Sequence, residues 1–270
     1  MILGTMTRRW VKIWLAPTLC LTLVSAQPAL PPMTLPSDMT PTPKIQQVAA
    51  REVNADVLGD LLADARKTYP KVKDYSCVLV KQERVNGKLL PEQTAQMTVR
   101  TQPFSVSMKF MSPSSIAGQE VCYVAGKNDG KMRVKGSGLK GALGFITIGL
   151  DDSRAMAQNR HTIETAGIGA LIEQITKLHA ESRENKSHTT AAEYLFNGRT
   201  CSRIEITQPE GAKSYCHRSV LFFEKETGLP VRFEAYDRPT QGNPAGELLE
   251  CYSYANLKFN GGVTEAMFAK

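Results

Sequence analysis

Two stretches on either side of a tight-turn dipeptide decide the fold: residues 75–84 (YSCVLVKQER) and residues 92–101 (EQTAQMTVRT), separated by Asn86-Gly87. The Asn-Gly dipeptide supplies the two positive-φ positions that a two-residue hairpin turn needs. The next stretch, residues 104–110 (FSVSMKF), alternates apolar and polar residues, which is the period of a strand with one buried and one solvated face. The sequence therefore predicts an antiparallel sheet that begins near Asp74.

Further strands are expected toward the C-terminus, joined by short turns. They fall at residues 119–125, 131–135, 193–208, 214–224, 229–237 and 247–259, for about nine strands in all. Apolar stripes predict helices over residues 54–69 and 168–179, a shorter helix is expected within 151–158, and the glycine-rich residues 136–149 are expected to form a loop. This pattern predicts an α+β domain in which helices cover one face of an antiparallel meander.

The N-terminus is organised differently. Residues 1–26 combine a basic start, an apolar stretch and a small-residue cleavage site, which predicts a secretory signal peptide and an exported, periplasmic or extracellular protein. Residues 27–48 are rich in proline and predict a disordered linker, so that residues 49–270 form the single domain. Removal of residues 1–26, which hold three basic and no acidic residues, lowers the net charge from +7 to +4. This ordinary charge gives no reason to expect a nucleic-acid partner, and no transmembrane segment is expected after signal cleavage.

Five cysteines remain in an oxidising compartment, where disulfides can persist. A turn centred near residue 208.5 would place Cys201 opposite Cys216, which predicts one cross-strand disulfide. Cys77 and Cys122 are expected about three strands apart, or ~14 Å, beyond the ~7 Å limit for a bridge. Cys77 could pair with Cys251 only if the first and last strands approach one another.

No catalytic motif, cofactor or metal site is recognisable, and the protein is expected to be non-catalytic. Residues 136–141 fit G-x-G-x-x-G, but the surrounding strands read as antiparallel, so a loop is favoured over a dinucleotide site. Several polar residues could still converge as acid, base and anion holder, although structural ion pairs are the favoured interpretation. These polar candidates are Glu83, Arg84, Glu120, Arg160 and His161.

Two surfaces are candidates for binding. Lys131, Arg133 and Lys135 alternate on one strand, and a solvated strand face is favoured there over contact with an anionic surface. A set of apolar strand residues could instead line a concave face that binds a hydrophobic ligand, with core packing as the competing interpretation. This set consists of Met97, Phe104, Met108, Phe110, Val231 and Phe233.

Several motifs together resemble a family of secreted bacterial proteins, the domain of unknown function 1571 family. They are KQER (81–84), NGKL (86–89), QPFSV (102–106), GQEV (118–121), NRH (159–161) and TGLPV (227–231), and the resemblance extends over residues 61–268. In its general sequence pattern, the chain also resembles the superfamily of outer-membrane lipoprotein carriers and receptors. The carrier resemblance implies a strongly curved sheet, an incomplete β-barrel, whose concave apolar face is covered by helices and takes up acyl chains.

Three functional hypotheses follow. The first is a binding protein that holds a lipid or a lipoprotein acyl chain between the curved sheet and its helices. The second is an envelope structural or protein-interaction domain whose concave face is a packed core. The third and least favoured is a hydrolase, which would require Glu83, Glu120 or His161 to lie within hydrogen-bond reach of one another in a cleft.

Overall fold

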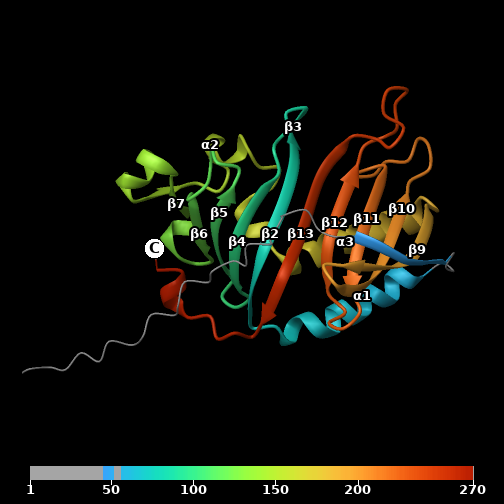
Figure 1. The fold of residues 1–270 in the computed structure, drawn as a ribbon, viewed down its shortest axis with the longest axis horizontal. Helices are drawn as coiled ribbons and strands as arrows, with labels where there is room; N and C mark the ends of the chain where they lie inside the picture. The colour runs from blue at the N-terminus through green and yellow to red at the C-terminus, as the bar shows by residue number, and fades with distance from the viewer. Residues whose placement is uncertain (1–44, 52–55, 270) are drawn as a thin grey trace, which may run out of the picture. The chain divides into compact units, whose positions relative to one another are not determined.

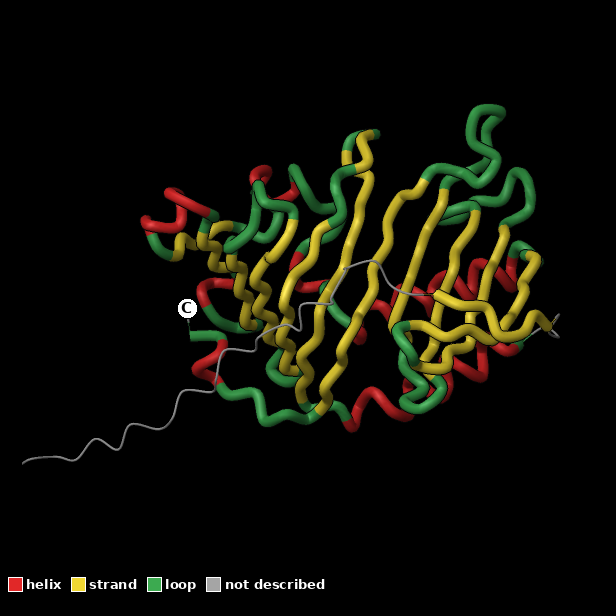
Figure 2. The backbone as a smooth tube through the Cα atoms, in the orientation of Figure 1, coloured by secondary structure: helices red, strands yellow, loops and turns green. Residues whose placement is uncertain are grey.

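A single antiparallel sheet of thirteen strands dominates the residues that the computed structural model describes, 45–51 and 56–269. The strands lie in the order β1-β9-β10-β11-β12-β13-β2-β4-β5-β6-β7-β8, and β3 pairs with β2. Their bounds are β1 Ile45–Arg51, β2 Asp74–Val85, β3 Lys88–Leu89, β4 Gln93–Arg100, β5 Ser105–Ser112, β6 Glu120–Val124, β7 Met132–Lys135, β8 Phe145–Ile148, β9 His188–Phe196, β10 Arg199–Thr207, β11 Arg218–Glu224, β12 Pro230–Tyr236 and β13 Leu248–Phe259. The sheet is open, with β1 and β8 as its edges (Figure 2).

Two amphipathic helices, α1 (Val57–Thr68) and α3 (Ile168–Glu184), lie on one side of the sheet (Figure 1). A short helix, α2 (Ser153–Met156), precedes α3. The apolar stripe of α3 is fully buried, and it packs against α1 and β12. The buried stripe consists of Ile168, Leu171, Ile172, Ile175 and Leu178. The predicted α+β architecture, a curved antiparallel sheet with helices on one face, is confirmed.

The strands that begin and end the meander meet in the middle of the sheet, because β2 pairs with β13 as well as with β4. The predicted turn at Asn86-Gly87 is present, with φ values of 50° and 79°. The same dipeptide at Asn197-Gly198, with φ values of 51° and 78°, divides the predicted strand over residues 193–208 into β9 and β10. That second turn accounts for one of the strands that the sequence analysis missed.

The glycine-rich segment is more structured than expected. It contains a 3-10 helix over Gly138–Leu143 and the edge strand β8. Because β8 runs antiparallel to β7, the G-x-G-x-x-G motif does not open a parallel βαβ unit, as a dinucleotide site requires. The dinucleotide interpretation has no support in the fold.

The predicted Cys201–Cys216 disulfide is wrong. Cys201 lies opposite Glu224, because the loop between β10 and β11 spans residues 208–217 and the hairpin is centred four residues later than expected. The five cysteines described are buried, and no disulfide joins any two of them. β2 and β13 do approach one another, but their register places Cys251 opposite Gln82, five residues along β2 from Cys77.

The predicted signal peptide, residues 1–26, lies outside the described residues, as does the linker up to residue 44. Residues 45–48 of the predicted linker belong to β1, which pairs with β9. The described residues group into one compact unit. Among the described residues, no helix combines the length and apolarity needed to cross a bilayer.

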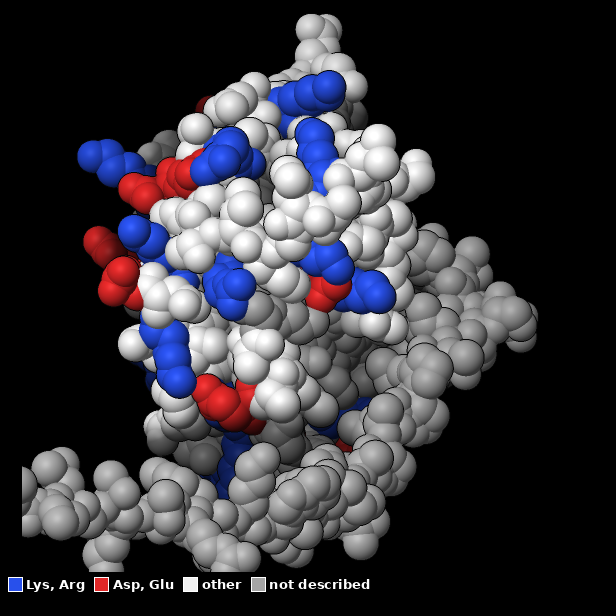
Figure 3. All heavy atoms as spheres, turned by 90° about the vertical axis from the view of Figure 1, so that its left-hand side faces the viewer, with Lys and Arg blue, Asp and Glu red and all other residues white. Residues whose placement is uncertain are grey.

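The basic strand is β7, near the β8 edge of the sheet. Figure 3 looks at the molecule from this side and shows Lys and Arg side chains spread across the face, with Asp and Glu beside several of them. Lys135 lies 3.5 Å from Glu120, and the guanidinium of Arg133 lies over the ring of Phe145. Two of the three basic side chains therefore have local partners.

Candidate functional site

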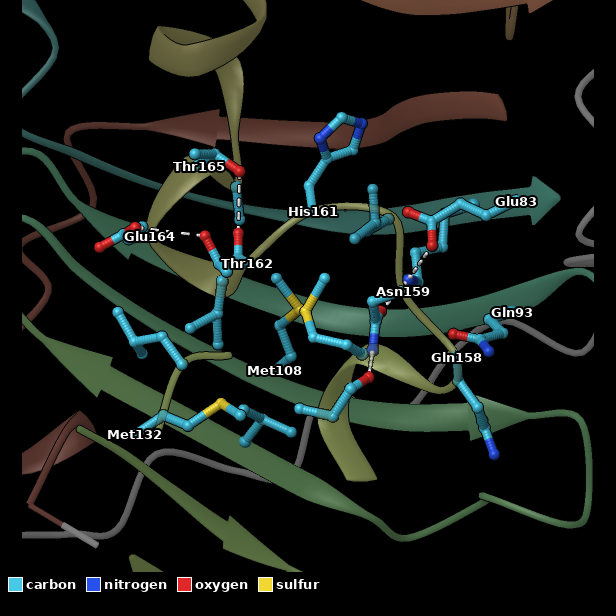
Figure 4. A pocket seen from close by; sticks show the side chains of 18 of the residues that line it. Glu83, Gln93, Met108, Met132, Gln158, Asn159, His161, Thr162, Glu164 and Thr165 are labelled. Carbon is cyan, nitrogen blue, oxygen red and sulfur yellow. Dashed lines mark hydrogen bonds and ion pairs between the residues drawn. The ribbon is translucent and has the colours of Figure 1, made fainter. Parts of the chain in front are cut away.

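A cavity of about 910 Å³ lies between the sheet and the chain segment that leads into α3. Its walls come from β2, β4–β8 and β13 on one side, and from residues 150–167 and one flank of α3 on the other. Figure 4 shows Met108 and Met132 on the strands facing Thr162 and Glu164 of the covering segment. The cavity thus occupies the space that a packed helix fills elsewhere on this face.

The apolar floor follows from strand register. Met97, Met108, Val121, Val134 and Ile146 form one row across β4–β8, each directly opposite the next. Opposed residues share a face of the sheet, so one row of apolar side chains crosses five strands. Four of the five line the cavity, and Met97 lies under Gly167 in the core.

The covering segment is attached to the sheet at the start of α3. The Ile168 backbone N–H donates to the hydroxyl of Tyr75, at 2.9 Å, and Tyr75 is fully buried. Gly167 has φ +97°, and a Cβ there would lie 2.3 Å from the Tyr75 hydroxyl oxygen. Glycine is therefore required at residue 167 for the helix to approach β2 this closely.

The inward face of the central strands changes from apolar to polar along their length. On β2 it carries Tyr75, Cys77 and Leu79 and then Lys81 and Glu83, all of which are buried. The neighbouring strands continue this change in register: Lys81 lies opposite both Gln93 and Tyr252, and Glu83 lies opposite Glu250. Figure 4 shows Glu83, Gln93 and Asn159 together at this end of the cavity.

Glu83 accepts three hydrogen bonds. The Tyr252 hydroxyl donates at 2.5 Å, the Arg160 backbone N–H at 3.0 Å and the Lys81 ammonium at 3.3 Å. Lys81 also donates to Asn159. Burial lowers the pKa of Lys81, and the negative charge of Glu83 opposes this effect.

Glu250 is fully buried and is the second carboxylate of the cluster. It accepts from His161 Nε2 at 2.7 Å and from Gln174 at 2.9 Å, and Arg160 Nε lies 3.3 Å away. Burial by itself raises the pKa of Glu250, but the donors, His161 first among them, outweigh it and leave the pKa below its usual value. Because Glu250 is then ionised at neutral pH, Nε2 of His161 carries the proton.

Both carboxylates accept hydrogen bonds from several donors, so neither is free to take a proton from a ligand. His161 donates to Glu250 through Nε2, which leaves its other ring nitrogen as an acceptor. The two cations Lys81 and Arg160 balance the two anions Glu83 and Glu250. Within the described residues, no group of three or more His, Cys, Asp and Glu side chains is placed to hold a metal ion.

The six apolar candidates lie in different surroundings. Met108 and Phe110 line the cavity. Met97, Val231 and Phe233 are buried in the core, at 1%, 4% and 0% exposure. Phe104 is half-buried and packs against Tyr123.

The five polar candidates are only partly brought together. Glu83 and His161 line the cavity, and Arg160 joins them through its backbone N–H and its ion pair with Glu250. Arg84 points away, pairs with Glu247 and contributes only its backbone oxygen, to Arg160. Glu120 lies outside the cluster, beside Lys135.

The sequence analysis missed most of the cluster. The missed residues are Lys81, Gln93, Asn159, Gln174, Glu250 and Tyr252. A signal was present for two of the charges, because Lys81 and Glu83 fall in phase with the apolar positions 75, 77 and 79 of the same strand. A charged residue at a strand position whose side chain points to the buried face predicts a buried polar group that needs hydrogen-bond partners.

Comparison with solved structures finds distant similarities. A DUF1329 family protein from Desulfovibrio piger is 15% identical (TM-score 0.39, 79% of this chain and 98% of that chain). The Mycobacterium tuberculosis lipoprotein LppX is 15% identical (TM-score 0.44, 76% and 98%). A LolA superfamily protein from Nitrosomonas europaea is 11% identical (TM-score 0.31, 78% and 97%). No curated protein matches the chain significantly.

A family model matches most of the sequence. It is the model described as Protein of unknown function (DUF1571), and it matches residues 72–270. The matched segment begins just before β2 and includes the whole cavity-forming part of the sheet. The chain therefore belongs to the DUF1571 family.

Proposed function

We propose that this protein is an exported, non-catalytic binding protein that holds a hydrophobic chain, such as that of a lipid or a lipoprotein acyl group, in the cavity beside β5–β8. The observation that carries the proposal is a cavity of about 910 Å³ with a continuous apolar floor. Ligand pockets are typically about 300–1,000 Å³ and mostly apolar. Burial of an acyl chain there would contribute about 0.8 kcal/mol per CH₂ group.

Export and partner are part of the same proposal. The basic and apolar pattern of residues 1–26 supports delivery across the inner membrane, into a compartment where the nearest sources of acyl chains are envelope lipids and lipoproteins. The proposal includes no nucleic acid, cofactor or metal.

The competing hypotheses have weaker support. An envelope interaction domain with a fully packed concave face does not account for the cavity. A hydrolase would need a general base hydrogen-bonded to a nucleophile, whereas Glu83 and Glu250 each accept several hydrogen bonds and His161 is hydrogen-bonded to Glu250.

The test is a displacement titration with saturated chains of increasing length against a fluorescent fatty-acid probe. At about 0.8 kcal/mol per CH₂, each added group is expected to lower Kd about fourfold until the cavity is filled. Lipid extraction and mass spectrometry of the purified protein are expected to reveal a co-purifying acyl lipid. Absence of saturable probe binding, or a Kd independent of chain length, would contradict the proposal.

A matched pair of variants locates the binding. Val134 lies opposite Ile146 on the cavity floor, whereas Thr147, the next residue on β8, is exposed on the other face. Val134→Phe is expected to weaken probe binding at least about tenfold, since a larger side chain fills part of the cavity. Thr147→Phe is expected to leave Kd unchanged, and equal losses in the two variants would place the probe elsewhere.

A further inference from the structure

One polar side chain at the charged end of the cavity has no partner. Gln93 is 7% exposed, lines the cavity, and makes no side-chain hydrogen bond to any residue in the described part of the chain. Its amide faces the cavity, so a ligand that displaces water there without replacing the hydrogen bonds would leave the amide unpaired, at a cost of about 1–3 kcal/mol. Such a group is retained more easily where a ligand supplies the missing hydrogen bonds.

Gln93 is one half of a cross-strand pair with Lys81. The Lys81 ammonium has three donors, and two of them are used, by Glu83 and Asn159. The nearby carboxylate oxygens are already occupied. This end of the cavity therefore offers spare N–H donors, from Lys81 and Gln93, together with one amide acceptor.

The charge of the lining limits the ligand further. Four basic side chains line the cavity, Lys81, Lys140, Arg154 and Lys177, and four acidic ones, Glu83, Glu164, Glu173 and Glu181. Apart from His161 these charges cancel, so the lining has no excess of Lys or Arg to compensate an anionic head group. A ligand carboxylate beside Lys81 would also lose its hydration and lie close to Glu83.

We infer that Lys81 and Gln93 form a head-group site for an uncharged acceptor, an ester or amide carbonyl, at the end of a single acyl chain that lies on the apolar floor. The inference rests on the proposed function and specifies its ligand class: acyl esters and amides are preferred over free fatty acids. The carbonyl oxygen accepts from Lys81 and from the Gln93 amide, and an amide N–H of the ligand donates to the Gln93 oxygen.

The experiment compares dodecanamide with dodecanoate as displacers of the fluorescent probe at pH 7.5, where dodecanoate is ionised. The wild-type protein is expected to bind the amide at least about tenfold more tightly. Gln93→Leu breaks no hydrogen bond within the protein and is expected to reduce this preference to less than about threefold. Gln96→Leu, the same change three residues along β4 on the other face, is the control and is expected to retain the full preference.

The outcomes separate the two proposals. Equal or tighter binding of dodecanoate, or a preference that survives Gln93→Leu as well as it survives Gln96→Leu, would overturn the head-group site and leave acyl-chain binding intact. Failure of both displacers and of the probe itself to bind would overturn the proposed function and the head-group site with it.

Discussion

The two ends of the sheet have similar strands but different covers. On β11–β13, inward side chains such as Leu221 and Phe233 are fully buried in the core that α3 helps to close. On β5–β8, inward side chains such as Val121 and Val134 face a cavity, because the segment before α3 lies over them without packing down. An alternating apolar pattern in a strand thus indicates that one face is buried. Whether that face becomes core or lines a cavity depends on the segment that covers it.

The largest expected difference between the two ends concerns two phenylalanines. Phe233 is fully buried in the core, and Phe110 borders the cavity. Phe233→Ala is expected to lower the free energy of unfolding by about 4 kcal/mol, since it removes burial and creates a void. Phe110→Ala is expected to cost about 2 kcal/mol less, because a void is already present. Urea unfolding measures both, and equal losses would mean that the cavity is closed in solution.

The polar end of the cavity is expected to depend on its buried carboxylate. Glu250→Gln is expected to lower the free energy of unfolding by about 3 kcal/mol at pH 7, since it leaves Arg160 and His161 without their anion. Glu247→Gln, which removes an exposed ion pair with Arg84, is the control and is expected to cost less than about 1 kcal/mol. Similar losses for the two variants would indicate that the cluster is solvated.

The same carboxylate predicts a pH dependence. The pKa of Glu250 is lower in the folded protein than its usual value of about 4.3. Its contribution to stability is therefore complete above about pH 4.3 and is lost as the pH falls through its folded pKa. Urea unfolding from pH 7 to pH 3 is expected to show a smaller acid destabilisation for Glu250→Gln than for the wild-type protein. Parallel pH profiles would contradict the assignment.

A small-to-large change is expected to separate the two ends in the same direction, with the larger loss of stability in the core. Val231 is 4% exposed in the core, and Val231→Phe is expected to cost about 1–3 kcal/mol through overpacking. Val134→Phe enters the cavity and is expected to leave stability within about 0.5 kcal/mol of the wild type. Thermal and urea unfolding of the pair check this, and a large loss for Val134→Phe would show that no free space exists beside β7.

The smallest expected effect is that of reductant on the labelling of the cysteines by an alkylating reagent. Burial raises the pKa of the Cys201 and Cys216 thiols to about 12, so both remain protonated and unreactive in the folded protein. Alkylation without reductant is expected to label none of the five described cysteines in the native protein and all of them in denaturant. If a cysteine resisted alkylation in denaturant and became labelled only after reductant was added, that result would reveal a disulfide.

Much of the fold could be predicted from local signals. Asn86-Gly87 and the alternation over residues 104–110 fix a turn and a strand, and the α3 stripe predicts a helix on one face. Asn197-Gly198 carried the same signal and was overlooked. The disulfide prediction failed because the alternation of side chains assigns each residue to a face of the sheet but does not give the length of the turn. The length of the loop over residues 208–217 determines which residues of β10 and β11 lie opposite one another.

The site could be predicted much less well. Met97 and Met108 are neighbours in register and look alike in sequence, yet one is in the core and the other lines the cavity. Their surroundings differ because of the path of residues 150–167. That segment has no sequence periodicity from which its path could be predicted. Glu250 and Glu83 meet only because β13 pairs with β2, a contact between segments that are far apart in the sequence.

The central claim is that an acyl chain occupies the β5–β8 end of the sheet and not the helix-packed end. Photolabelling with a diazirine-bearing acyl probe, followed by mass spectrometry of the labelled peptides, tests it most directly. The predicted result is saturable labelling of the peptides that contain Met108, Met132 and Ile148, competed by unlabelled chain and reduced in Val134→Phe. Labelling of α1 or β10–β12 instead, or labelling that an unlabelled chain does not compete, would contradict it.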